Sequence, residues 1–515
     1  MTENARAAVR IVLVTPRGQS LQDWQARLID RIAADPRFDF VGQIEGEGRR
    51  ADPAPSPVLR MVLAGERALM HRRIRPYDTG PARRLLDSLV NRAPAQADLA
   101  LALSTGALSD GQLAAVGHGE WSVTFSGAAD PSWIGAARDI HGAETVDVDI
   151  IARSADHPSA RVVRRAGYNP KPGAVLTGAF VAEKSVLLML RALWDLAAGR
   201  APDRPAPLPL AAPAVPGVTA SLGYAAQFAR IALRKLREES RTRQGRARVY
   251  WRLASGTGAL ADLSLTSAAR LPALTHTMAD PFLFHDDGSD WLFYEAMNAD
   301  DGDGWIAAAR LVGDGLETPV TALARPYHLS FPFVFRDGGD IYMMPETCQS
   351  QRLEVWRATR FPTDWVLHAT AFEGQHLADS SLFKAQDGQW WLLTNLSDHH
   401  AFQDHSSELY LFAVDGPDLT SIVAHPDNPV AIGADHARNA GAIIRQDGRL
   451  FRPSQNNSFG VYGYGLNLME ISRLDATAFD ESLIRRFTPA DRPGITGIHH
   501  LSVAGDRYVF DWSGQ

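Results

Sequence analysis

Acidic side chains recur at matching places in the C-terminal half of the chain. Asp280 and Asp379 stand at the start of short apolar strands, and Glu295, Glu346 and Asp511 stand at the end of the strands that follow. Glycosyl transfer needs one group that manages the proton and another that stabilises or deprotonates at the reacting carbon. Carboxylates can perform both tasks, provided that the fold brings these distant positions together.

The units that carry these residues repeat roughly every 50 to 60 residues, which is the length of one four-stranded propeller blade. Each unit contains a strand, a tight turn with Asp-Gly or Gly-Asp, and an aromatic-rich second strand. Asp-Gly is a strong hairpin signal. The fifth unit ends after two strands, and residues 248–253 have the composition of a missing third strand. We therefore expect five blades, closed into a ring that leaves no exposed sheet edge.

In such a ring the first strands enter and the second strands leave at the same end, so their terminal residues converge on a central pocket. We predict catalytic roles for Asp280, Glu346 and Asp379. Substrate-binding roles are predicted for the other entry and exit residues, which are Glu295, His328, Asn395, Asn439, Gln455, Asn456, His500 and Asp511. No metal is expected, and a cofactor stays unknown.

Structural roles compete with these assignments. Asp280 and Asp379 could cap blade turns, because aspartate often bonds backbone there. Glu346 could serve as a salt-bridge partner, and His500 could be a packed core histidine.

Two segments carry a resemblance to a family. Met278-Ala-Asp280-Pro-Phe and Leu377-Ala-Asp379-Ser-Ser resemble the first and third blades of the arabinanase and xylosidase type of five-bladed glycoside hydrolase. The resemblance implies that Asp280 is the general base and that Asp379 orients and tunes the acid. The segment 497–503 with His500 resembles the fifth blade, which implies a histidine near the axis.

One position departs from that pattern. The family's acid is a glutamate at the entry of the fourth blade, where this chain has Asn439-Ala-Gly441, and asparagine cannot donate a proton in this role. Either Glu346 supplies the acid, or the site has moved to transfer from a phosphate-type leaving group. In the second case Arg325, His328 and Arg438 would meet the phosphate charge.

A second resemblance covers about residues 248–515. Segments 327–335 and 341–347 resemble the propeller domain found in the N-terminal part of glucosamine inositolphosphorylceramide transferases. This resemblance implies the five-bladed fold and handling of a sugar.

Residues 1–200 alternate short apolar strands (10–14, 38–41, 99–103, 146–151) with helical patterns (21–33, 183–198), which predicts a doubly wound, largely parallel α/β sheet. Segments 99–104, 119–127 and 146–150 resemble the N-terminal fold of formyltransferases that use folate-bound formyl groups. That chemistry needs an asparagine, a histidine and an aspartate. Here the strand reads Trp121-Ser122-Val123-Thr124-Phe125, and only Asp156 matches, so the domain has the pattern of a degenerate relative.

The remaining segments and the composition complete the expected organisation. Residues 201–218 form a Pro/Ala linker, residues 219–247 a basic connecting helix, and residues 248–515 the propeller. The helix suits a membrane surface or a partner, or else a solvated brace between domains. The net charge of −7 and the single Cys348 argue against nucleic-acid binding and disulfides. With no secretion signal or membrane span in the sequence, we expect a cytoplasmic protein.

The sequence thus predicts a carbohydrate-active protein that transfers a sugar to or from an activated or lipid-linked sugar in surface glycan or glycolipid biosynthesis. The expected partners are a sugar or nucleotide sugar and a lipid-linked acceptor. Three alternatives stay open: a glycoside hydrolase of the arabinanase and xylosidase type, a non-catalytic glycan-binding module, and a sugar N-formyltransferase, which Ser122 and Thr124 disfavour.

Overall fold

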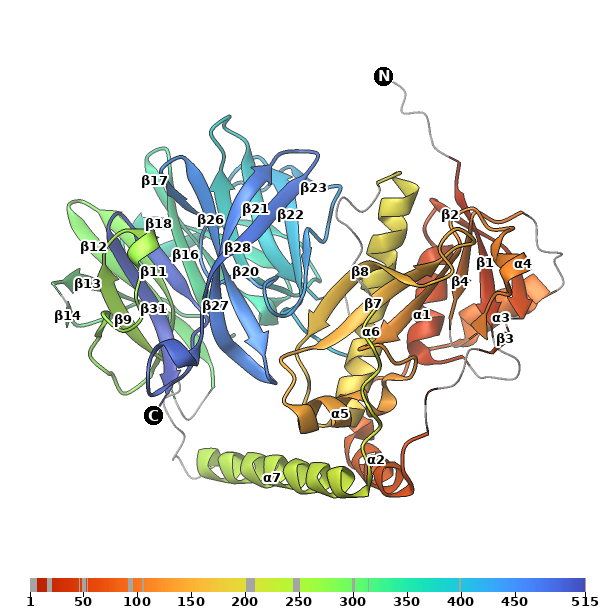
Figure 1. Cartoon of the computed structure of the whole chain (residues 1–515). Coiled ribbons are helices and arrows are strands. Elements are labelled where there is room, and N and C mark those ends of the chain that lie inside the picture. The colour runs from red at the N-terminus through yellow and green to blue at the C-terminus, as the bar shows by residue number, and fades with distance from the viewer. Residues whose placement is uncertain are drawn as a thin grey trace. The chain divides into compact units, whose positions relative to one another are not determined.

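The computed structural model describes residues 7–15, 21–45, 47–48, 52, 54–90, 96–103, 106–200, 209–243, 251–298, 302–313, 315–397 and 400–514. The chain divides into two compact units, residues 1–231 with 399–403, and residues 232–398 with 404–515. Figure 1 shows that the first unit mixes helices and strands and that the second consists mainly of strands.

The first unit is built on a six-stranded sheet in the order β2-β1-β4-β6-β7-β8. The strands β1, β2, β4 and β6 run parallel, whereas β7 and β8 add to the β6 edge as antiparallel strands. The expected α/β sheet is confirmed, but its last strands are antiparallel, and the sequence patterns did not predict β8. The bounds are β1 (Val9–Thr15), β2 (Phe38–Glu45), β4 (Leu99–Ala102), β6 (Glu120–Phe125), β7 (Val146–Arg153) and β8 (Arg161–Tyr168), with a small ribbon of β3 (Glu47–Gly48) and β5 (Gly106–Ala107).

Helices cover both faces of this sheet. Leu113 of α4 packs with Val12, Val14 and Ala100 on one face. The long α6 is apolar around most of its circumference and is therefore buried along most of its length, against α1, β6, β7 and β8. The helices are α1 (Asp23–Ala33), α2 (Pro57–Met70), α3 (Gly80–Val90), α4 (Asp110–Leu113), α5 (Ile134–His141) and α6 (Ala174–Ala197).

Formyl transfer, which the sequence disfavours, would depend on residues in and beside this sheet. Asp156 is exposed in the turn between β7 and β8, where Ser154 and His157 exchange backbone hydrogen bonds. Ser122 and Thr124 are buried on β6. The formyltransferase resemblance stays a prediction.

A single helix, α7 (Val218–Arg243), follows the proline-rich segment. The predicted basic helix is therefore present from residue 218, while residues 201–208 and 244–250 lie outside the described residues. Among the described helices, none combines the length and apolarity needed to cross a membrane.

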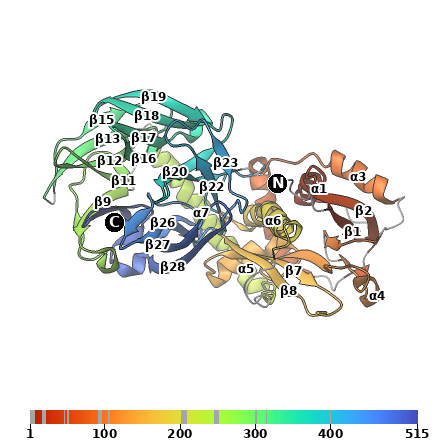
Figure 2. The ribbon, with the colours of Figure 1, turned by 90° about the horizontal axis from the view of Figure 1, so that it is seen from above.

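The second unit contains, in its described residues, five antiparallel sheets that follow one another along the chain. First strands of neighbouring blades contact one another (β11 with β16 and β30, β16 with β20), so they form the inner wall of the ring that Figure 2 shows from above. Blade one consists of β11 (Thr277–Asp286), β12 (Ser289–Met297), β13 (Gly304–Val312), β14 (Gly315–Leu316) and β15 (Val320–Leu323). Blade two consists of β16 (Ser330–Asp337), β17 (Asp340–Glu346), β18 (Leu353–Arg360) and β19 (Asp364–Ala371), and blade three of β20 (Leu377–Lys384), β21 (Trp390–Leu396), β22 (Glu408–Val414), β23 (Ile422–Ala424) and β24 (Ala431–Ile432). Blade four consists of β25 (Ile444–Gln446), β26 (Arg449–Ser458), β27 (Val461–Leu474) and β28 (Phe479–Phe487), and blade five of β29 (Ile495–Gly497), β30 (Leu501–Ala504), β31 (Arg507–Gly514), β9 (Trp251–Thr257) and β10 (Ala269–Arg270).

The ring closes between the two ends of this region. Strand β9 pairs antiparallel with β31 from Trp251 opposite Ser513 to Thr257 opposite Arg507. The C-terminal hairpin β30–β31 therefore gains its third strand from the start of the propeller. The predicted closure is confirmed, although residues 248–250 lie outside the described residues.

We expect Ser255→Pro to destabilise the propeller. Ser255 is buried and lies in β9 between β10 and β31, so proline removes an N–H from a central ladder. A buried carbonyl left without its donor costs about 1–3 kcal/mol. Urea unfolding should show this loss for Ser255→Pro, whereas Ser255→Thr, which keeps the N–H and the hydroxyl, should stay near the parent chain. Equal stability of the two variants would contradict the closure.

Candidate active site

The inner strands of the first three blades share a β-bulge at their entry. The register shifts between Ala279 and Phe282, between Ser330 and Phe333, and between Ala378 and Ser381. Each bulge holds a non-glycine residue in the left-handed region: Asp280 at φ +48°, Phe331 at +45° and Asp379 at +47°. This conformation is unfavourable for side chains with a Cβ and is concentrated at functional sites. A bulge also re-aims its side chain, so three successive blades direct their entry residues in the same way.

Side chains at the ends of second strands hold two of these bulges in place, and in the third the N–H of Phe331 donates to Asp280 Oδ2 (3.1 Å). The N–H of Asp280 donates to Asp511 Oδ2 (3.1 Å), and the N–H of Asp379 donates to Glu346 Oε2 (3.2 Å). In the same way, the N–H of Asn439 donates to Asn395 Oδ1 (3.0 Å). The exit residue of one blade therefore accepts from the entry residue of the next. We call the carboxylates Asp280, Glu295, Glu346, Asp379 and Asp511 the acidic cluster.

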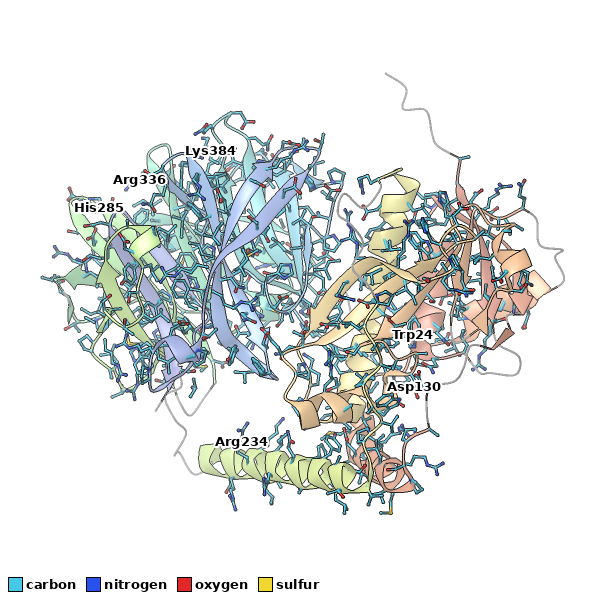
Figure 3. All side chains as sticks on the ribbon, viewed as in Figure 1. Trp24, Asp130, Arg234, His285, Arg336 and Lys384 are labelled. Atoms are coloured by element: carbon cyan, nitrogen blue, oxygen red, sulfur yellow. The ribbon has the colours of Figure 1, made fainter. Side chains whose placement is uncertain are left out.

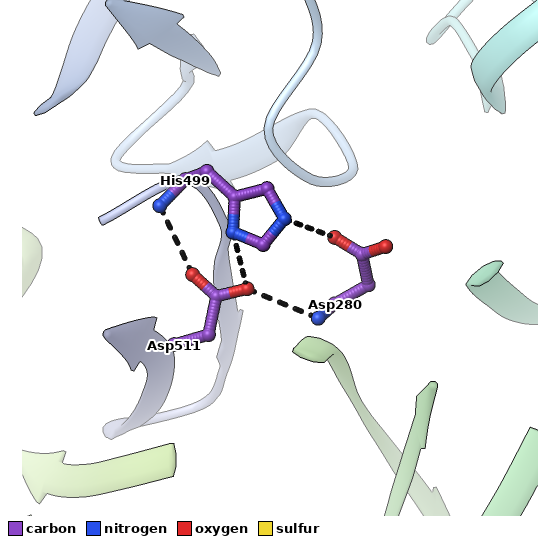
Figure 4. A group of neighbouring side chains, drawn as sticks. All are labelled: Asp280, His499 and Asp511. Atoms are coloured by element: carbon purple, nitrogen blue, oxygen red, sulfur yellow. Dashed lines mark hydrogen bonds and ion pairs between the residues drawn. The ribbon is translucent and has the colours of Figure 1, made fainter. Parts of the chain in front are cut away.

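Asp280, His499 and Asp511 form one part of this cluster (Figure 4). His499 Nε2 lies 3.4 Å from Asp280 Oδ1 and its Nδ1 lies 2.7 Å from Asp511 Oδ2, the latter an ion-pair contact without hydrogen-bond alignment. Burial alone would raise the pKa of Asp280, but His499, His500 and Arg438 outweigh it and lower this pKa to about 2. Burial likewise opposes the charge of His499, yet Asp511 and Asp280 raise its pKa to about 9. Asp280 is therefore held as a carboxylate.

Asp379, Arg438 and Glu346 form the second part. Arg438 Nε donates to Asp379 Oδ2 (2.6 Å), and Arg438 Nη2 lies 3.8 Å from Glu346 Oε2. Gln455 Nε2 donates to the same Asp379 oxygen (3.1 Å). Burial, together with the charge of Asp379, raises the pKa of Glu346 to about 8 against the opposing effect of Arg438. Glu346 is therefore held protonated at neutral pH.

Glu295 and His328 form a third pair. The N–H of Gly304 donates to His328 Nδ1 (2.9 Å), which leaves the ring proton on Nε2, 3.3 Å from Glu295 Oε1. Burial raises the pKa of Glu295. The side chains of His328, Glu346, Arg438 and Glu295 are 25%, 14%, 12% and 11% exposed, against 7% for Asp280 and 3% for Asp379. These four residues therefore lie on the more open side of the cluster.

Several predicted binding residues are more deeply buried than the four residues on the open side of the acidic cluster. Asn395 and Asn439 are fully buried, and the amide of Asn395 donates to the carbonyls of Glu408 and Ala437, while that of Asn439 donates to the carbonyl of Asp379. Asp511 accepts three backbone N–H groups, from Asp280, His499 and His500. These side chains position the cluster in the structure, and their contact with substrate stays a prediction.

His500 and Asn456 are also fully buried. The His500 ring packs edge-to-face against Phe282 and Phe331, with ring centroids 4.6 and 5.1 Å away. Asn456 Oδ1 accepts from the Ser458 hydroxyl (2.5 Å). His500 thus has the surroundings of a packed core histidine, with Nδ1 3.4 Å from Asp280 Oδ1.

One residue of the phosphate-binding hypothesis, Arg325, has a different partner, and two aromatic residues near the cluster were missed. Arg325 stacks on Trp356, 4.1 Å from the ring centre, and is exposed beside the outer strand β15, while its grouping with His328 and Arg438 stays a prediction. Trp251 stacks on His499 at 4.0 Å, and Tyr462 lies edge-on to the same ring at 5.4 Å. The sequence offered a weak signal for each residue: Trp251 stands at the start of a strand, and Tyr462 lies in a hairpin rich in aromatic residues.

The fold and the acidic cluster define a five-bladed β-propeller with a buried, carboxylate-rich site at the entry of its inner strands. Residues 249–492 match the family model described as "Glucosamine inositolphosphorylceramide transferase 1, N-terminal". The propeller region therefore contains a domain of this family, as the resemblance of segments 327–335 and 341–347 predicted.

Relatives and solved structures give a consistent picture. Two proteins named glucosamine inositolphosphorylceramide transferase 1 are similar to this chain. The protein from Oryza sativa subsp. japonica is 35% identical over 211 residues, which cover 40% of this chain and 27% of the relative. The protein from Arabidopsis thaliana is 32% identical over 256 residues, which cover 48% of this chain and 32% of the relative. The matches thus span about a third or less of these relatives. Two solved structures also match. A family 117 glycoside hydrolase from Zobellia galactanivorans has a TM-score of 0.33 and 12% identity, and the match covers 52% of this chain and 92% of that chain. A thermostable family-43 glycoside hydrolase has a TM-score of 0.35 and 14% identity, and the match covers 46% of this chain and 86% of that chain. At these low TM-scores the five-bladed fold rests on the sheet topology itself.

The raised pKa of Glu346 predicts a specific dependence of stability on pH. The folded chain keeps a proton that the unfolded chain releases above about pH 4.5, so this contribution is complete below pH 4.5 and is lost as the pH rises through about 8. For one proton the unfolding equilibrium constant changes at most about tenfold per pH unit. Glu346→Gln keeps an acceptor for the Asp379 N–H and should flatten the thermal unfolding profile between these pH values.

The exposed Glu317, which pairs with Arg310 on blade one, supplies the control. Glu317→Gln should leave the pH profile of the parent chain intact. A profile for Glu346→Gln that parallels the parent chain over this range would show that Glu346 titrates like an ordinary glutamate.

Proposed function

We propose that this chain transfers a sugar to or from an activated or lipid-linked sugar, in the assembly of a surface glycan or glycolipid. The observation that carries the proposal is the pair of opposite protonation states in one buried cluster, with the pKa of Asp280 lowered to about 2 and that of Glu346 raised to about 8. Carboxyl groups whose environments push their pKa values apart are suited to separate basic and acidic roles.

The proposed roles follow from these protonation states. Asp280, ionised beside His499, would accept the proton of the attacking hydroxyl or stabilise positive charge at the anomeric carbon. Glu346, protonated and more exposed, would donate a proton to the leaving oxygen. Asp379 would orient the site through its bonds with Arg438 and Gln455. Glu346 would thus take the place of the acid that Asn439 cannot supply.

The substrate class is inferred from the relatives. Their name describes a transferase of glucosamine and inositolphosphorylceramide, and we propose by analogy a sugar donor and a phosphate-bearing lipid acceptor for this chain. Arg438 would meet developing negative charge, since a guanidinium suits phosphate and carboxylate oxygens alike. The proposed compartment is the cytoplasm.

Hydrolysis remains the second candidate function because Met278-Ala-Asp280-Pro and Leu377-Ala-Asp379 resemble glycoside hydrolase segments. A hydrolase would use the same two carboxyl groups with water as the acceptor. The two functions differ in whether the sugar is passed to a lipid or released into water.

We expect Asp280→Asn to lower the rate of sugar turnover by about 10²–10⁴-fold, the usual contribution of a positioned acid or base. Asp290→Asn removes a carboxylate from the same blade, where Asp290 pairs with the exposed His285, and should leave the rate unchanged. The assay follows radiolabelled sugar from nucleotide sugars into a lipid extract and from aryl glycosides into water. Turnover in either assay that survives Asp280→Asn would exclude Asp280 as the base, and label that enters water alone would favour the hydrolase.

The role of Glu346 predicts a dependence on the leaving group. Glu346→Gln should slow substrates with a poor leaving group, such as alkyl glycosides, far more than donors that release a phosphate, because a phosphate oxygen needs little protonation. The rate with a poor leaving group should also fall above about pH 8, where Glu346 loses its proton. An equal effect of the variant on both kinds of donor would contradict proton donation by Glu346.

A further inference from the structure

Helix α7 carries a positive charge that contrasts with the rest of the chain. It contains six arginine and lysine residues and two glutamates, whereas the whole chain has a net charge of −7. Residues 218–237 contain four of the cations and no carboxylate. This concentration of charge on one helix favours an anionic partner.

One face at the beginning of α7 fixes the helix to the first unit. Tyr224 is buried, its hydroxyl donates to Glu66 Oε2 (2.7 Å), and it accepts from the N–H of Ala174 (2.5 Å). Ser221 on the preceding turn is also buried. The start of α7 is therefore anchored to α2 and α6 by named contacts.

The face away from this anchor is an exposed apolar stripe. Val218, Leu222, Leu233 and Leu236 are 53%, 58%, 53% and 61% exposed, and at 3.6 residues per turn they fall within an arc of about 60°. Tyr224 lies on the far side of the helix from them. Leucine and valine side chains left exposed in one line on a helix are typical of a surface that binds something else.

A row of arginines borders this stripe. Arg230, Arg234 and Arg237 are all exposed and fall within a second arc of about 60° beside the leucines. Figure 3 shows Arg234 on α7 among side chains that project from the helix. Apolar and cationic faces that adjoin in this way match the boundary between acyl chains and anionic headgroups.

We propose that α7 is an interfacial helix that binds the surface of a membrane containing anionic lipid. The leucine stripe enters the headgroup boundary, and the arginine row meets the lipid phosphates. A second copy of the chain is a poorer occupant, because antiparallel pairing of two such stripes would bring arginine rows of like charge together. The proposal is independent of the sugar chemistry, and a membrane surface is where a lipid-linked sugar would be found.

The test uses the full chain with vesicles of phosphatidylcholine alone or of phosphatidylcholine mixed with phosphatidylserine. The chain should sediment with the mixed vesicles, and added salt should release it, because screening weakens the attraction to headgroups. Leu233→Ser with Leu236→Ser, and separately Arg234→Glu with Arg237→Glu, should each weaken vesicle binding roughly tenfold or more.

Leu483→Ser with Ile484→Ser is the matched control, because these residues of β28 are 47% and 49% exposed and lie outside the helix. This control should bind like the parent chain, and all variants should unfold at the parent's temperature. No sedimentation, equal sedimentation with both kinds of vesicle, or a vesicle-free dimer that Leu233→Ser with Leu236→Ser dissolves would each overturn the proposal.

Discussion

The site depends on one repeated interaction, the hydrogen bond from the backbone of a bulge to a side chain of the preceding blade. Asp511 accepts from Asp280, Asp280 from Phe331, and Glu346 from Asp379. A left-handed bulge residue is costly on its own, and a buried polar side chain without a partner is costly as well. Each of these bonds stabilises a left-handed bulge and also gives a buried polar side chain a partner. The same bonds bring carboxyl groups from blades that are far apart in the sequence into one cluster.

The electrostatics follow from that placement. Burying several carboxyl groups together raises the pKa of those without a close cation, and a cation beside one of them holds it ionised. His499 does this for Asp280. Arg438 bonds mainly to Asp379, at 2.6 Å rather than the 3.8 Å that separates it from Glu346, so Glu346 retains its proton. The asymmetric position of one guanidinium thereby leaves Glu346 as a proton donor.

The repeats predicted the blades, the ring closure through β9 and the convergence of Asp280, Glu346 and Asp379, because hairpin signals and alternating strands are local in sequence. The bulges could not be predicted in the same way, since Asp280, Phe331 and Asp379 share a conformation but not a residue type. The bond between Arg438 and Asp379 joins blades three and four and has no local signal. Likewise, Asn395 and Asn439 were expected to face the substrate, but their amides bond backbone across blades. In the first unit, β8 escaped prediction because its three arginines resemble a polar segment.

The most direct test of this account is the protonation state of Glu346 in the folded chain. Infrared difference spectra between the parent chain and Glu346→Gln report the C=O stretch of a protonated carboxyl group at this one position. We expect that band to be present at neutral pH and to disappear with a midpoint near pH 8. Loss of the band near pH 4.5, or its absence at neutral pH, would contradict the claim that the propeller holds a protonated acid beside an ionised base.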